Sequence, residues 1–153
     1  MSRETATVVI EDLPFGLTEY ANHYPDLIKT AQSIKTDPAP LALVRERLVK
    51  KNGMTEQKAQ TAETHFLRFV LLTEVADGPI SPTKLGDDYW HEFLMFTRTY
   101  RSWCQWHFGE MIDHEPGAKE GAKDRVKQLH QQFFGTNDIT VSAWCSCRCC
   151  CYK

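Results

Sequence analysis

Residues 85–114 read LGDDYWHEFLMFTRTYRSWCQWHFGEMIDH, and this stretch decides the fold. It contains three of the four tryptophans, three of the six histidines and the only cysteine outside the last nine residues. Its bulky aromatic residues recur every three or four positions, the spacing at which side chains share one face of an α-helix. A long helix is therefore predicted from Asp87 to Phe108, with Gly109 kinking or ending it and Pro116–Gly117 stopping any continuation.

The flanking segments also show helical patterns, separated by breaking signals. Pro25 either breaks the first helix or begins a second one. Asp37 to Pro40 is a turn, because a residue that precedes proline is pushed out of the helical region. Asn52–Gly53 is a C-terminal cap, Thr55 is an N-terminal cap, and residues 76–83 are a Gly/Pro connector. Helices are predicted over residues 18–34, 41–51, 56–75, 87–108 and 118–134.

These patterns predict an all-α fold, an irregular bundle of about five helices. Residues 1–16 form a short irregular lead-in, within which residues 7–10 could make a brief strand. The chain is expected to divide into a single helical domain, residues 1–144, and a cysteine-rich C-terminal tail, residues 145–153. A chain of 153 residues is long enough to bury one substantial core.

The composition excludes several classes of partner. The formal net charge is −2, with both signs mixed, so no electrostatic attraction to nucleic acid or to an anionic membrane is expected. The chain does not begin with a basic region followed by an apolar run, and no apolar stretch approaches the length of a bilayer span. We therefore expect a cytoplasmic protein with no transmembrane segment, whose partner is an unidentified protein.

The central stretch carries candidate metal ligands. Asp87 and His91 are four residues apart, so on a helix they share a face and could meet one ion. A second stripe, at spacings of three, four or seven residues, comprises Tyr100, Cys104, His107, Met111 and His114. His91 and His107 are 16 residues apart, which is roughly 160° around a helix at about 100° per residue. A single straight helix cannot bring both to one ion, so a kink or a ligand from a neighbouring helix is required.

Each candidate also has a purely structural interpretation. Asp87 or Asp88 could cap the helix, where a carboxylate meets free N–H groups. Cys104 is of a type most often found as a small buried hydrophobe, and His107 and His114 could be surface or hydrogen-bonded core residues. The aromatic residues of the stretch are expected in the core, namely Trp90, Phe93, Phe96, Tyr100, Trp103 and Trp106.

The remaining cysteines crowd into the tail at Cys145, Cys147, Cys149, Cys150 and Cys151. A disulfide framework would spread its cysteines through the chain, and a structural zinc site takes Cys-x₂₋₄-Cys pairs from two separated elements. The tail instead predicts a flexible thiolate cluster for a soft ion, Cu(I) or Zn²⁺. The alternatives are S-acylation, intermolecular disulfides, enzymatic modification of a precursor peptide, and a tail without a function.

Three segments together resemble the signature of the glycine-rich-domain-containing protein family: DDYWHEF, TRTYRSWC and HFGEMIDHEP. The matching positions are Asp87, Trp90, His91, Tyr100, Cys104, His114 and Pro116. The resemblance extends over residues 63–144 and implies a fold and a site rather than a reaction. Two features depart from the family pattern, because Phe93 stands where many members have a second histidine and the long glycine-rich region is absent.

These observations predict a non-enzymatic binding or interaction protein. A metal ion, zinc or Cu(I), would be held by a central cluster comprising Asp87, His91, Cys104, His107 and His114. One alternative is a folded carrier for a modified C-terminal peptide. Another is an enzyme, with a catalytic metal at Asp87 and His91 or with Cys104 as nucleophile and His107 as base.

The sequence offers little support for the enzyme alternative. It has no glycine-rich phosphate loop and no nucleophile elbow. His91-Glu92 begins like the HExxH zinc-protease motif, but the fifth position is Met95. The known catalytic motifs therefore do not assign a reaction.

Overall fold

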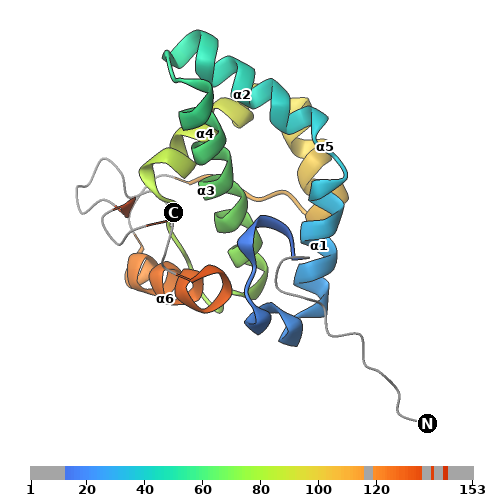
Figure 1. Ribbon diagram of the computed structural model, residues 1–153, viewed down its shortest axis with the longest axis vertical. Helices are drawn as coiled ribbons and strands as arrows, with labels where there is room; N and C mark the ends of the chain where they lie inside the picture. The colour runs from blue at the N-terminus through green and yellow to red at the C-terminus, as the bar shows by residue number, and fades with distance from the viewer. Residues whose placement is uncertain (1–12, 116–118, 136–138, 140–142, 145–153) are drawn as a thin grey trace.

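The computed structural model describes residues 13–115, 119–135, 139 and 143–144 (Figure 1). Within these residues the chain is all-helical, which confirms the predicted fold class. Two short 3-10 helices, η2 (Pro14–Gly16) and η3 (Glu19–His23), precede six α-helices. These are α1 (Pro25–Lys35), α2 (Ala39–Asn52), α3 (Glu56–Val75), α4 (Lys84–Met95), α5 (Thr97–Phe108) and α6 (Ala122–Phe134). The strand suggested at residues 7–10 lies outside the described residues.

Helix α3 is the central element, and Figure 1 shows it running through the middle of the molecule. Ten of its residues are buried, including the continuous run from His65 to Leu72. Its most extensive contact is with α4. Gly86 permits this close approach, because a Cβ atom there would lie 3.3 Å from the backbone carbonyl carbon of His65 and from the backbone nitrogen of Phe66. The element that carries the candidate ligands is therefore held directly on the core helix.

Several helix ends fall where the sequence predicts them. Pro25 occupies the first turn of α1 and so begins a separate helix, where its missing N–H costs nothing. Gly53 ends α2 in the left-handed conformation, and Gly109 ends α5 in the same way. The Thr55 side chain accepts a hydrogen bond from the Lys58 backbone N–H and caps α3. The capping predictions are thus confirmed at these positions.

The predicted long helix over residues 87–108 is two helices, which raises the number of α-helices to six. The chain breaks at Phe96, whose φ and ψ of −94° and 62° lie outside the helical region. The first helix begins at Lys84, three residues earlier than predicted, because Thr83 is the cap and its hydroxyl accepts from the Gly86 N–H. Capping by Asp87 or Asp88 is therefore wrong, and the Asp87 carboxylate is available for other contacts.

The break at Phe96 folds the aromatic residues of α4 and α5 into one cluster around Phe66 of α3. Phe93 packs against Tyr100 and Trp103, with ring centroids 5.1 and 5.2 Å apart. The predicted core position is confirmed for Trp90, Phe93, Tyr100 and Trp103, whereas Phe96 is only partly buried. It is wrong for Trp106, which is 78% exposed. The buried face of α5 comprises Tyr100, Trp103, Cys104 and His107.

Arg68 ties the N-terminal segment and α6 to the core helix. Its side chain is almost fully buried, donates a hydrogen bond of 2.9 Å to the Phe15 carbonyl and lies 3.3 Å from His130 Nε2. The guanidinium also lies over the Phe134 ring, 5.0 Å from its centroid.

No helix in the described ranges is long and apolar enough to cross a bilayer.

Candidate metal centre

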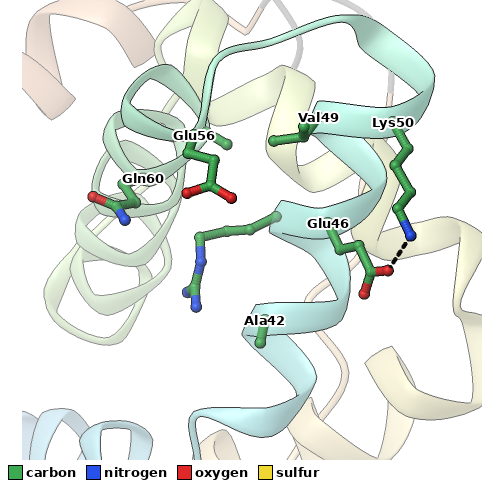
Figure 2. Close-up of a pocket in the computed structure, with 8 residues that line it drawn as sticks. Ala42, Glu46, Val49, Lys50, Glu56 and Gln60 are labelled. Carbon is green, nitrogen blue, oxygen red and sulfur yellow. Dashed lines mark hydrogen bonds and ion pairs between the residues drawn. The ribbon is translucent and has the colours of Figure 1, made fainter.

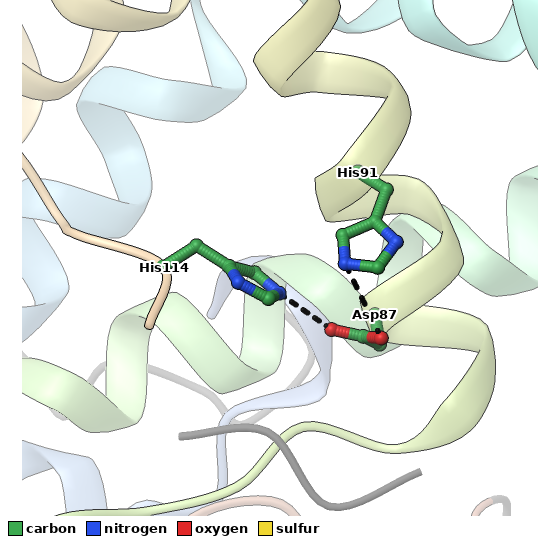
Figure 3. Close-up of side chains that lie close together, drawn as sticks. All are labelled: Asp87, His91 and His114. Atoms are coloured by element: carbon green, nitrogen blue, oxygen red, sulfur yellow. Dashed lines mark hydrogen bonds and ion pairs between the residues drawn. The ribbon is translucent and has the colours of Figure 1, made fainter. Parts of the chain in front are cut away.

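Three of the predicted ligands meet on one side of α4, namely Asp87, His91 and His114. Figure 3 shows both imidazole rings turned toward the Asp87 carboxylate. His114 Nε2 lies 2.7 Å from Asp87 Oδ1, and His91 Nε2 lies 3.6 Å from Asp87 Oδ2. One ligand atom from each of the three residues lies within 4.8 Å of the other two. This is the only group of three or more such ligands within the described part of the chain.

The three side chains come from two elements. Asp87 and His91 share a face of α4 through their four-residue spacing, as the sequence predicts. His114 comes from the non-helical segment that follows α5, after Gly109 has ended that helix. The third ligand is therefore supplied by the segment after α5 and not by a continuation of the helix.

A chain of hydrogen bonds fixes this returning segment. The indole N–H of Trp90 donates to the Tyr100 hydroxyl over 2.9 Å, and that hydroxyl donates to the Ile112 carbonyl. Burial raises the pKa of Tyr100 well above its ordinary value, so the hydroxyl remains a neutral donor. The Trp90 ring also packs against His114, with centroids 4.2 Å apart. The sequence pattern contained Trp90 and Tyr100 but gave no sign of this positioning role.

We predict that replacing Tyr100 with phenylalanine loosens the segment that carries His114. The change removes the hydroxyl but keeps the ring, leaving the buried Trp90 N–H and the Ile112 carbonyl without their bridge. The free energy of unfolding should fall by about 1–3 kcal/mol, measured by urea denaturation. Hydrogen exchange at residues 112–114 should accelerate more than exchange in α3. Unchanged stability and exchange would show that the bridge does not hold the segment.

Burial divides the cluster into a covered side and an open side. The side chains of Asp87 and His114 are 7% and 8% exposed, whereas that of His91 is 47% exposed. His91 lies at the surface, so an ion could reach the cluster from solvent on that side. The arrangement offers three protein ligands on one side and leaves the other side of an ion accessible, as in zinc sites that keep an open position.

A small ion would require the three side chains to adjust, because their ligand atoms lie within 4.8 Å of one another. Four-coordinate zinc with bonds of about 2.0–2.1 Å separates its ligand atoms by about 3.4 Å. The two contacts to Asp87, 2.7 and 3.6 Å, lie on either side of that value. A proton on His114 Nε2 would account for the shorter contact, and a bound ion would take the place of that proton.

Cys104 does not join this cluster. It is fully buried on α5, and its thiol interacts with the Tyr100 hydroxyl and with the Ile112 backbone. Burial raises the pKa of the thiol, an effect that these two hydrogen bonds only partly oppose. Cys104 therefore lies behind the segment that positions His114, as part of its packing.

We expect Cys104 to react slowly with iodoacetamide. The reactive form is the thiolate, which burial disfavours, and the folded chain blocks access to the sulfur. Peptide mapping by mass spectrometry should show alkylation of Cys104 at least about tenfold slower in the native chain than in urea. Equal rates in the two conditions would contradict the buried position.

His107 is also separate from the cluster, because both of its ring nitrogens are engaged elsewhere. Nδ1 lies 2.7 Å from the Ser33 hydroxyl, and Nε2 lies 2.9 Å from Asp37 Oδ2. Both partners come from the end of α1 and the turn after it, so the ring joins α5 to α1. A nucleophile–base pair with Cys104 would need one of these nitrogens, and the geometry does not provide it.

The series Ser33–His107–Asp37 contains the residue types of a hydrolase triad. The His107 side chain is 0% exposed, whereas the Asp37 side chain is 38% exposed. Ser33 lies in the last turn of α1, where the helix dipole is negative and disfavours an oxyanion. We therefore interpret the series as a structural bridge.

A surface pocket lies between α2 and the first turns of α3 and has a volume of about 330 Å³ (Figure 2). Its charged side chains are largely paired with one another or with nearby residues. Lys50 lies 2.5 Å from Glu46, and Arg45 forms an ion pair with Glu63. The pocket therefore offers a ligand few uncompensated charges.

The five tail cysteines lie outside the described residues, as does the boundary of the predicted tail at residue 145. Binding of a soft metal there stays a prediction. Among the ten metal ligands suggested by the sequence, the structure brings together Asp87, His91 and His114.

The comparisons with known proteins identify the family. No curated protein and no solved structure matches the chain. A family model described as UCP032817-like matches residues 29–135, a range that begins within α1 and contains α2 to α6 and all three clustered residues, although residues 116–118 within it are not described. This finding corrects the predicted membership of the glycine-rich-domain-containing family, for which a resemblance of short segments was insufficient. The chain belongs to the UCP032817-like family.

Proposed function

We propose that this protein binds a divalent metal ion, zinc in the first instance, through Asp87, His91 and His114. The observation that carries the proposal is the convergence of one carboxylate and two imidazoles within 4.8 Å. Two imidazoles and a carboxylate form a donor set of intermediate hardness that suits zinc, whereas Cu(I) favours the thiolates of the tail. The proposed function is metal binding, without an assigned reaction.

The surroundings of the cluster support this proposal. Asp87 is held on the buried side of α4, His114 is positioned by the Tyr100 bridge, and His91 lies at the surface. Two positioned ligands and one accessible ligand would allow an ion to enter from solvent. The open side would then take water or a donor atom from a partner molecule.

Calorimetric titration of zinc into the full chain tests the proposal, provided that the tail is removed as a competing ligand. We would replace all five tail cysteines with serine and leave the rest of the chain unchanged. The expected result is one zinc ion bound per chain, with loss of binding when His114 is also replaced by alanine. If the serine variant binds no zinc while the unaltered chain does, the metal belongs to the tail and the proposal is wrong.

A further inference from the structure

The outer face of α5 exposes one large aromatic side chain. Trp106 is 78% exposed, whereas Trp90 and Trp103 are each 2% exposed. An exposed tryptophan leaves a large apolar surface in water, and tryptophan is enriched among residues that dominate protein interfaces. Trp106 therefore offers a large apolar contact to a partner.

Trp106 lies at a broad groove between α5 and the turn that joins α1 to α2. The groove has a volume of about 710 Å³, and its lining includes Thr36, Pro40, Arg98, Trp103 and Trp106. It is open to solvent and so fits a peptide segment better than an enclosed small molecule. The aromatic and proline side chains would supply the apolar contact.

The exposed face of α5 is positively charged. Arg98 and Arg101 are both exposed, and the helix contains neither aspartate nor glutamate. Neither arginine forms an ion pair with any residue that the structure describes. Asp37 is the acidic residue in the groove lining, and its carboxylate is already bonded to His107. Arg98 lines the groove with Trp106, whereas Arg101 lies on the exposed face of α5 outside the groove lining. Arg98 is thus left to face a partner in the groove.

We infer that this groove binds an acidic segment of another protein that carries an aromatic or aliphatic anchor. A carboxylate would pair with Arg98, and the anchor would pack against Trp106. Arg98 and Trp106 are eight residues apart, which is about 12 Å along a helix. An extended peptide spans that distance in about four residues. The anchor should therefore lie two to four positions from the acidic residues.

A phage-displayed library of random twelve-residue peptides, selected on the immobilised full chain, tests this inference. We expect enrichment of peptides in which acidic residues lie two to four positions from a large apolar residue. For a selected peptide, binding measured by fluorescence anisotropy should weaken roughly tenfold or more with Trp106→Ala or with Arg98→Glu. Lys58→Glu, a charge change on an exposed position of α3, should leave the affinity unchanged.

Several outcomes would overturn the inference. They are a failure to enrich any peptide, enrichment of peptides without acidic residues, and selected peptides whose binding survives both groove variants. A dimer in light scattering that Trp106→Ala dissociates would assign the groove to a second copy. Binding of a single-stranded oligonucleotide that requires Arg98 would assign it to nucleic acid. Circular dichroism of each variant establishes that the fold is retained.

Discussion

Replacing Asp87 with asparagine is expected to weaken zinc binding by about 100-fold or more. The amide keeps the shape of the side chain and an oxygen that can accept from His114, but it lacks the negative charge that the ion requires. Asp87 is the residue that contacts both imidazoles, so its replacement removes the ligand that lies between them. Calorimetric titration of the full chain with serine at the tail cysteines measures the change.

Asp88 provides the matched control on the same helix. It is the next residue along α4, its carboxylate lies 3.4 Å from Lys84 Nζ, and it does not belong to the ligand group of Asp87, His91 and His114. Asp88→Asn removes the same charge and should leave zinc affinity within about twofold, since a surface ion pair contributes little. Equal losses in the two variants would attribute the effect to net charge, and unchanged affinity in Asp87→Asn would exclude Asp87 as a ligand.

The second large effect is expected at the centre of the core. Phe66→Ala should lower the free energy of unfolding by about 3–5 kcal/mol, because a fully buried aromatic ring is replaced by a cavity. The Phe66 side chain is 0% exposed and stacks on Tyr89 with ring centroids 5.0 Å apart. It also contacts Phe93 and Trp103, at 5.8 and 5.9 Å. Urea denaturation followed by circular dichroism measures the loss.

Leu43→Ala is the control for this prediction, because Leu43 lies on α2 with 45% of its surface exposed. Its replacement should change stability by less than about 0.5 kcal/mol. Phe66→Leu should fall between the two, since it leaves a smaller cavity. A Phe66→Ala variant as stable as the native chain would contradict the packing of α3, α4 and α5 around this ring.

Much of the fold could be predicted because single residues mark several of the helix ends. Gly53, Gly109 and Thr55 mark helix ends through conformations and hydrogen bonds that depend on their own side chains. The break at Phe96 has no such marker, because no glycine or proline lies there. It is favoured by the tertiary packing of Phe93 on Tyr100, which helical periodicity does not contain.

The candidate site could be predicted in part for the same reason. The pairing of Asp87 with His91 follows from spacing on one helix. The choice of His114 over Cys104 and His107 depends on where the chain returns after Gly109, and that path is set by the bonds from Trp90 through Tyr100 to Ile112. The core position predicted for Trp106 is wrong, because a periodic aromatic pattern does not show which side of a helix lacks a packing neighbour.

A crystal of the protein soaked with zinc and measured at the zinc absorption edge tests the central claim most directly. The account predicts an anomalous peak between Asp87, His91 and His114, about 2.0–2.2 Å from one atom of each. It also predicts that the peak disappears in Asp87→Asn. A fully occupied zinc ion elsewhere, with the Asp87–His114 hydrogen bond intact, would contradict the account and leave the three residues as a structural contact.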